Sequence, residues 1–183
     1  MLLTEFDDNR QAIINPEDLN EPLEGFPKIA VSCFSRSTFQ RMLEMFPHEL
    51  IYETSMANVA IPIYKLVIDE QELALFNAPV GASACVAILE DIFALGTDKL
   101  VLFGTCGVLD EDIKETSIII PSHALRDEGT SFHYVEASNE IAVNVGVLAC
   151  FRSYLNERQI PHKEGKVWTC LLYTSDAADD LIG

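Results

Sequence analysis

The chain has 183 residues and a mass of 20.3 kDa; 49% of its residues are hydrophobic and 22% are charged. This is the composition of one folded globular domain, and it excludes an intrinsically disordered chain. The net charge of −17, from 29 acidic and 12 basic residues, excludes nucleic acid and anionic membrane surfaces as partners, because such a surface repels phosphate groups.

The chain also lacks the sequence signals of secretion and of a membrane span. No stretch approaches the ~18 uninterrupted apolar residues of a transmembrane helix. The first ten residues, MLLTEFDDNR, carry acids where a secretory signal needs a basic region and an apolar core. The five cysteines lie mostly inside apolar runs, so we expect buried free thiols and a cytoplasmic protein.

The predicted elements alternate between strands and helices. Short apolar runs predict buried strands, and Ser37 and Ser83 predict helix starts. Pro62, inside a predicted hairpin, indicates an edge strand. In chain order we expect a polar surface arm at 1–27, a strand at 28–34, a helix at 38–46, a hairpin of strands at 60–68 and 72–79, a helix at 84–95, strands at 99–103 and 116–121, a helix at 141–155 and a strand from 165. This order predicts an α/β fold with a central sheet, mostly parallel or mixed, flanked by helices.

The most distinctive segment is the run Gly104-Thr105-Cys106-Gly107, which directly follows the strand predicted at 99–103. Small residues beyond the carboxyl end of a strand lie where open α/β sheets bind ligands. Glycines there let a ligand approach the backbone, and exposed amides can face an anion. A tight structural turn explains the same pattern at least as well.

Two further segments have polar or small residues at strand ends. Residues 77–91 form a strand, a glycine turn and a helix start, for which a simple connection is the favoured interpretation. Residues 123–134 form a dense polar loop that fits a site, or a loop held by an ion pair of Arg126 with Asp127 or Glu128. The four histidines have no zinc-ligand spacing, so we expect no metal site.

Taken together, three segments resemble a known family. The order of VGASACVAILEDIFALG, VLFGTCGVL and IIIPSHALRDEGTSFHY is similar to the nucleoside phosphorylase and nucleosidase superfamily, nearest to its uridine-phosphorylase-like branch, over about residues 29–169. The resemblance implies an α/β protein with a mixed central sheet and a homo-oligomer, a hexamer built from dimers. It implies an enzyme that transfers the pentose of a nucleoside to inorganic phosphate, a co-substrate, with no metal or organic cofactor.

The resemblance also assigns expected roles to individual residues. Thr105, beside Gly104, matches the threonine that contacts phosphate and ribose, and Arg36 is the candidate phosphate-binding arginine after the first strand. Cys106 and Gly107 match positions beside the base, and Val80 matches an apolar position that borders the sugar. Arg126 and Gly129 match loop positions that we interpret as structural.

Two positions depart from the family pattern and leave three functions open. Leu102 and Val59 stand where family phosphorylases have arginines, and guanidinium groups supply the bidentate grip on phosphate. The leading expectation is phosphorolysis of uridine or a similar nucleoside to free base and pentose 1-phosphate. The alternatives are a phosphate-independent nucleosidase and a non-catalytic nucleoside-binding or assembly protein.

The last residues do not fit the family pattern. Residues 170–180, CLLYTSDAADD, resemble the translation of a transposase-type sequencing adaptor. We therefore expect 170–183 to be a non-native tail after an incomplete nucleoside phosphorylase-like domain at 28–169, which would make the chain a C-terminally truncated fragment. The catalytic residues are then expected in the missing part, and the truncated chain itself is expected to be inactive.

Overall fold

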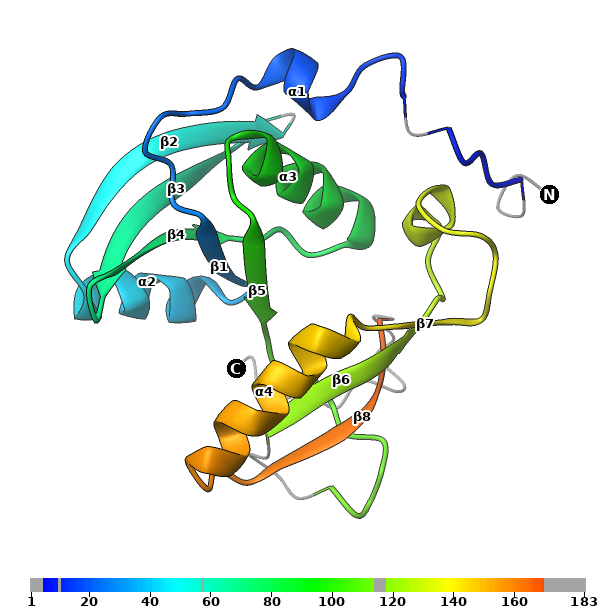
Figure 1. Ribbon diagram of the computed structural model, residues 1–183. Coiled ribbons are helices and arrows are strands. Elements are labelled where there is room, and N and C mark those ends of the chain that lie inside the picture. The colour runs from blue at the N-terminus through cyan, green and yellow to red at the C-terminus, as the bar shows by residue number, and fades with distance from the viewer. Residues whose placement is uncertain (1–4, 10, 57, 114–117, 170–183) are drawn as a thin grey trace. The chain divides into compact units, whose positions relative to one another are not determined.

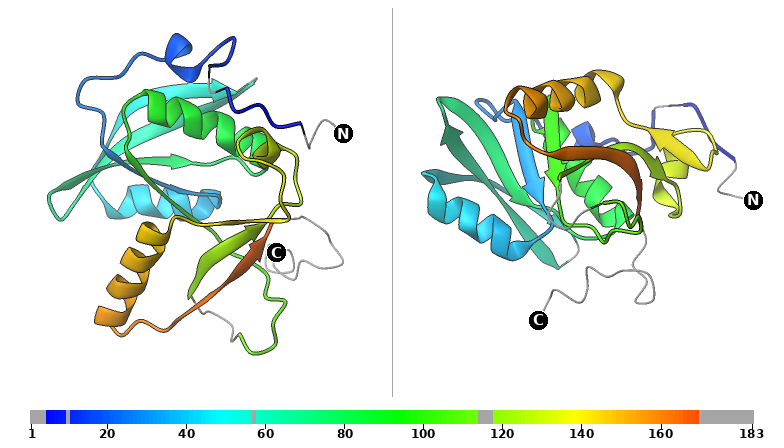
Figure 2. Two further views of the ribbon diagram at one scale, coloured as in Figure 1. Left: turned by 45° about the vertical axis from the view of Figure 1, so that its right-hand side comes forward. Right: turned by 90° about the horizontal axis from the view of Figure 1, so that it is seen from below.

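The computed structural model describes residues 5–9, 11–56, 58–113 and 118–169, and these form two compact units (Figures 1 and 2). The five-stranded unit is Asn9–Gly104, and the three-stranded unit takes in the remaining described residues, most of them after Gly104. Each unit has its own sheet, which is flanked by at least one helix.

The sheet of the five-stranded unit is mixed. Its strands are β1 (Ile29–Cys33), β2 (His48–Met56), β3 (Val59–Ile68), β4 (Gln71–Asn77) and β5 (Lys99–Phe103), in the order β2-β3-β4-β1-β5. β4, β1 and β5 run parallel, whereas β2, β3 and β4 form an antiparallel meander. Helices α2 (Arg36–Met45) and α3 (Ala82–Ala94) follow β1 and β4 and lie on opposite faces (Figure 1). The predicted α/β fold with a mixed sheet flanked by helices is confirmed.

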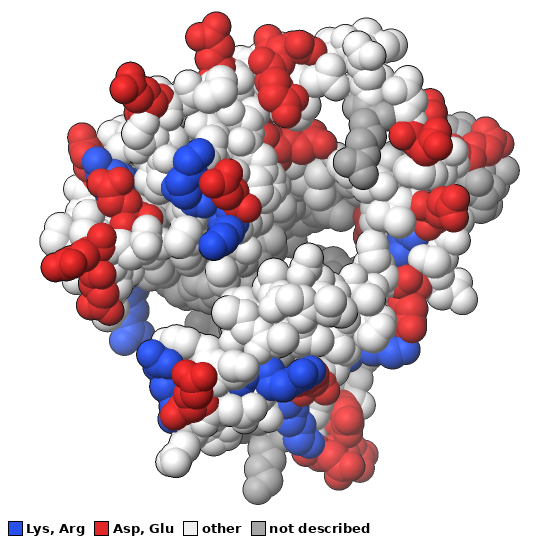
Figure 3. Space-filling view, in the orientation of Figure 1, with Lys and Arg blue, Asp and Glu red and all other residues white. Residues whose placement is uncertain are grey.

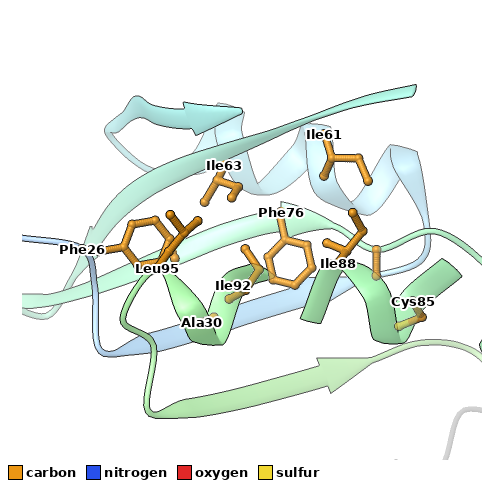
Figure 4. Close-up of a cluster of buried hydrophobic side chains, with 11 residues drawn as sticks. Phe26, Ala30, Ile61, Ile63, Phe76, Cys85, Ile88, Ile92 and Leu95 are labelled. Carbon is orange, nitrogen blue, oxygen red and sulfur yellow. The ribbon is translucent and has the colours of Figure 1, made fainter. Parts of the chain in front are cut away.

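Two apolar clusters, one on each face, hold this sheet and its helices together. On the α3 face, Phe76 of β4 packs with Ile88 and Ile92 of α3 (Figure 4). On the α2 face, Leu75 of β4 packs with Phe39 of α2. Neighbouring residues of one strand thus supply opposite faces, because side chains alternate along a strand. The buried members of the α3 cluster are Phe26, Ala30, Ile61, Ile63, Ala74, Phe76, Ala78, Cys85, Ile88, Ile92 and Leu95.

The two helices predicted in this unit, α2 and α3, both begin earlier than expected. α2 begins earlier than expected, because the Oγ of Ser35, not of Ser37, accepts the backbone N–H of Thr38 at 3.3 Å. α3 begins at a turn in which Gly81 has φ +110°, so Ser83 lies inside the helix rather than at its cap. The left-handed backbone at Gly81 favours glycine for steric reasons, which accounts for a helix start without a side-chain cap.

Strand β2 was not predicted from the sequence. Because β2 pairs with β3, the expectation from Pro62 that β3 is an edge strand is wrong for β3 as a whole. β3 lies between β2 and β4. Pairing of β3 with β4 begins only at Tyr64, so at Pro62 the registered partner is Glu53 of β2 alone. Proline is tolerated where one side of a strand needs no ladder hydrogen bond, so Pro62 occupies a locally edge-like position.

Part of the predicted surface arm packs on the five-stranded unit. After the short helix α1 (Pro16–Leu19), Asn20 donates from Nδ2 to Asp91 Oδ1 of α3 at 2.8 Å. The other carboxylate oxygen of Asp91 accepts the Thr54 hydroxyl of β2 at 2.7 Å. Phe26 is buried in the α3 cluster. The Asp91 carboxylate of α3 therefore links the segment before β1 to strand β2.

The three-stranded unit has β6 (Ile118–Leu125) at its centre, antiparallel to β7 (Glu140–Ala142) and parallel to β8 (His162–Trp168). Its helix α4 (Val145–Glu157) starts later than predicted, because Asn144 Oδ1 accepts the backbone N–H groups of Gly146 and Val147. Residues 140–142 pair with β6 instead. The polar segment 123–134 begins as strand, then passes into the short 3-10 helix η2 (Thr130–His133).

Acidic side chains are spread over the surface seen in Figure 3, with fewer basic ones among them. Within the described part of the chain, no helix is long and apolar enough to cross a membrane. Cys33 and Cys85 are buried free thiols, as predicted, and burial raises the pKa of both. Cys106 and Cys150 are exposed, so the expectation of buried thiols was wrong for them. The expected tail 170–183 lies outside the described residues.

Candidate functional site

The carboxyl ends of three parallel strands meet at one edge of the five-stranded sheet. β4, β1 and β5 are neighbours, and Cys33, the last residue of β1, is in register with Asn77 and Phe103, the last residues of the other two. Arg36, Val80 and Gly104 each follow one of these strand ends closely. Three residues that the sequence nominated are thus brought to one edge, which is where open α/β sheets bind ligands.

Arg36 is the first residue of α2, and its side chain is exposed. No ion pair found among the described residues includes it. A cation at a helix N-terminus faces the positive end of the helix dipole, which is unfavourable by about 0.3–1 kcal/mol. Its guanidinium is therefore an exposed donor group near this edge that forms no ion pair with the acidic residues that the structure describes.

Asn77 fixes the relation between the ends of β1 and β4. Its Nδ2 donates to the carbonyl oxygen of Cys33 at 2.6 Å, and the backbone N–H of Ala78 donates to the same oxygen at 3.0 Å. Val80, three residues on, is 74% exposed and precedes the Gly81 turn. Nothing in the sequence distinguishes Asn77 as a site residue, because its partner is a backbone atom 44 positions away.

Gly104 is in close contact with the aromatic ring of Phe34. A Cβ atom at Gly104 would lie 3.1 Å from Phe34 Cδ2, which is closer than ordinary van der Waals contact. Leu102, the apolar replacement noted in the sequence, is in register with Ser32 and Phe76 and so shares the α3 face with them. Val59 is the first residue of β3 and is paired with Met56, the last residue of β2.

Thr105, Cys106 and Gly107 continue the chain beyond Gly104 as an irregular segment of the three-stranded unit. Thr105 and Cys106 are exposed and Gly107 is half-buried. The nominated residues therefore divide between the units: Arg36, Val80 and Gly104 in one, and Thr105 to Gly107 in the other.

In the three-stranded unit, Arg126 organises the loop between β6 and β7. Its side chain is 8% exposed and donates to Ser131 Oγ at 2.9 Å, Glu136 O at 2.6 Å, Ser138 Oγ at 2.9 Å and Val135 O at 3.1 Å. The guanidinium carbon also lies 4.1 Å from the centre of the Phe132 ring. Arg126 thus holds its loop chiefly through hydrogen bonds to neutral acceptors rather than through the ion pair considered above.

The two acidic neighbours of Arg126 also have defined partners. Burial alone would raise the pKa of Glu128, but hydrogen bonds from the Ser131 hydroxyl and from the Ser131 and Thr130 backbone, with the Arg126 charge, outweigh it and lower that pKa. Asp127 Oδ2 accepts the indole N–H of Trp168 at 2.9 Å. These contacts give both acidic residues structural roles in the loop.

Other features of the described residues can be compared with this strand edge as possible sites. A hollow of about 310 Å³ lies by α1, the end of β2 and α3, lined by Ile14, Asn15, Pro16, Leu19, Ser55, Met56, Ala87, Ile88, Glu90 and Asp91. Across the residues that the structure describes, no group of His, Cys, Asp and Glu side chains is arranged to hold a metal ion. The strand edge, where three nominated residues meet, is therefore the strongest candidate.

The chain belongs to the phosphorylase superfamily, whose sequence profile matches residues 28–180. The match extends beyond Thr169 and so includes most of residues 170–183, the segment that we expect to be a non-native tail. The non-native origin of this tail therefore remains a prediction. Two characterised relatives are a guanosine phosphorylase from Halorubrum lacusprofundi, 27% identical over 74 residues (39% of this chain and 31% of that protein), and a uridine phosphorylase from Treponema pallidum, 24% identical over 98 residues (54% and 38%). The matched part thus spans only about a third of each relative, 31% of one and 38% of the other.

Solved structures share the fold. A uridine phosphorylase from Vibrio fischeri has a TM-score of 0.71 at 17% identity, covering 93% of this chain and 70% of that one. A 5′-methylthioadenosine/S-adenosylhomocysteine nucleosidase from Helicobacter pylori has a TM-score of 0.63 at 21% identity, covering 80% of this chain and 65% of that one. The fold is therefore that of nucleoside phosphorylases and nucleosidases alike.

Proposed function

We propose that this chain represents a pentosyltransferase that cleaves a nucleoside, uridine or a similar one, by phosphorolysis to free base and pentose 1-phosphate. The observation that carries the proposal is the position of Arg36, an exposed cation without a described acidic partner, at the edge where the parallel strands end. Membership of the superfamily and the phosphorylase names of both relatives support the same reaction.

The reaction is a displacement at the anomeric carbon of the sugar through an oxocarbenium-like state. In this proposal Arg36 holds phosphate on the face opposite the departing base, and Thr105 contacts phosphate and ribose. Gly104, Cys106, Gly107 and Val80 border the sugar and base. A charge-assisted hydrogen bond contributes roughly 1.5–3 kcal/mol, and orientation of the two reactants supplies much of the remaining acceleration.

The residues named so far do not include a catalytic residue. We propose that the catalytic residues belong to a segment that follows Thr169. We also propose that inorganic phosphate is the co-substrate and that no metal or organic cofactor takes part. A homo-oligomer, a hexamer built from dimers, and a cytoplasmic location belong to the same proposal.

A phosphate-independent nucleosidase is the second candidate. Leu102 places an apolar side chain where family phosphorylases have arginine, and the Phe34 ring covers one side of Gly104. Both features reduce the number of donors for a phosphate ion. With water as the nucleophile, the products would be free base and free pentose.

The test measures base and sugar released from uridine, inosine and guanosine, with and without phosphate, by a protein that includes the segment that this proposal places after Thr169. Phosphorolysis predicts a strict phosphate requirement and pentose 1-phosphate as product. Arg36→Ala should raise the KM for phosphate by roughly 10–100-fold, the loss of one charge-assisted bond. Arg41→Ala, an exposed arginine farther along α2, is the matched control and should leave that KM unchanged. Equal base release without phosphate, with free ribose as product, would establish the nucleosidase instead.

A further inference from the structure

The contact between Phe34 and Gly104 is the feature of the strand edge that neither the sequence pattern nor the proposed reaction accounts for. Gly104 is not one of the glycines with positive φ, which among the described residues are Gly25, Gly81 and Gly96. A Cβ at Gly104 would instead be crowded, since it would lie 3.1 Å from Cδ2 of the Phe34 ring, which would have to shift by a few tenths of an ångström, and in ordinary contact with Cε2 at 3.8 Å. The glycine therefore admits an aromatic ring of this chain.

Register explains why these two residues meet. Cys33 and Phe103 are the last paired residues of β1 and β5, so Phe34 and Gly104 are the first residues beyond the paired ends of neighbouring strands. The Phe34 side chain is 38% exposed, so it covers Gly104 and still presents ring surface at the edge. Arg36 follows two residues later, at the first position of α2.

The ring changes which chemical groups this part of the edge can accept. A phenylalanine ring donates no conventional hydrogen bond, and its face carries negative electrostatic potential, so it is a poor neighbour for phosphate. The same ring gives apolar contact and stacking for a base or for the apolar face of a sugar. The side of Gly104 covered by Phe34 is therefore suited to the organic part of a ligand and unsuited to an anion.

We infer that Phe34 is a specificity-determining residue, which takes the apolar face of a nucleoside and excludes an anion from the Gly104 side of the edge. Arg36 is then the contact for phosphate in the five-stranded unit. This inference rests on the proposed nucleoside-cleaving function and assigns a role to a residue that the sequence resemblance did not match. It also predicts that removal of the ring has opposite effects on the two ligands.

The test measures binding of uridine and, separately, of inorganic phosphate to the 183-residue chain by titration calorimetry. Phe34→Ala should weaken uridine binding and tighten phosphate binding, each by roughly tenfold. Phe34→Leu, which keeps an apolar side chain, should give smaller changes in both. The control is Phe93→Ala, which removes another exposed phenylalanine, near the C-terminal end of α3, and should change neither affinity.

The outcomes separate this inference from the proposed function. If the unchanged chain binds uridine and Phe34→Ala alters neither affinity, the role of Phe34 is refuted while the nucleoside function stands. If no nucleoside binds to this chain but Phe34→Ala still tightens phosphate binding, the nucleoside contact of Phe34 is refuted and the exclusion of the anion stands. No nucleoside binding together with unchanged phosphate binding overturns the whole role of Phe34, whereas the proposed function fails only in the activity assay described above.

Discussion

Replacing Arg126 by alanine tests whether one buried arginine organises the loop of the three-stranded unit. The substitution removes four donated hydrogen bonds and the contact with the Phe132 ring. It leaves two hydroxyl and two carbonyl acceptors without this donor. Because these groups come from residues spread between 131 and 138, the loop loses the side chain that joins its parts.

The magnitude follows from the number and exposure of these bonds. Each contributes about 1 kcal/mol net, which sets a total near 4 kcal/mol. Val135, Glu136 and Ser138 are exposed, so water can replace part of what they lose. The stacked ring adds about 0.5–1 kcal/mol. We therefore expect Arg126→Ala to lower the free energy of unfolding by about 3 kcal/mol.

Denaturant unfolding gives this free energy, and amide hydrogen exchange over residues 126–139 shows whether the loss is local. Arg126→Lys keeps the charge but not the planar fork, and should recover less than half of the loss. The control is Arg152→Ala, which breaks the exposed pair of Arg152 with Glu164 and should cost much less. Equal destabilisation by Arg126→Ala and Arg152→Ala would refute the reasoning.

Three further predictions concern other parts of the chain. The pKa of Glu128 is lowered in the folded protein, so its ionised carboxylate stabilises the fold above the ordinary pKa of 4.5, and this contribution is lost as the pH falls through the lower pKa of the folded state. Glu128→Gln should therefore flatten the pH dependence of the free energy of unfolding in the acid range. Gly104→Ala should lower the melting temperature of the unchanged chain but have a smaller effect in Phe34→Ala, because the added Cβ meets the Phe34 ring; equal shifts in both backgrounds would contradict the contact. Deletion of 170–183 should change the free energy of unfolding by no more than about 0.5 kcal/mol, and a larger change in a denaturant titration would show that these residues belong to the fold.

Much of the fold could be predicted because it depends on local patterns. Lys99–Phe103 was predicted with its observed bounds, since a compact apolar run followed by glycine determines both ends of β5. The hairpin of β3 and β4 was found from two apolar runs separated by a short polar turn. By contrast, β2 carries exposed polar side chains over much of its length and becomes a strand through pairing with β3. Local patterns give little information about such an element.

The candidate site shows the same division. Gly104 and Arg36 could be nominated from the sequence, because a glycine after a predicted buried strand and a cation near a predicted strand end can be recognised from the sequence alone. The position of both residues at one edge of the sheet depends on the strand order β4-β1-β5, in which strands distant in the sequence are neighbours. The contact of Phe34 with Gly104 depends on the register of β1 against β5. The sequence alone determined which residue types stand at the strand ends; only the tertiary structure decided which of them meet, because strand order and register are set by the packing of the whole sheet.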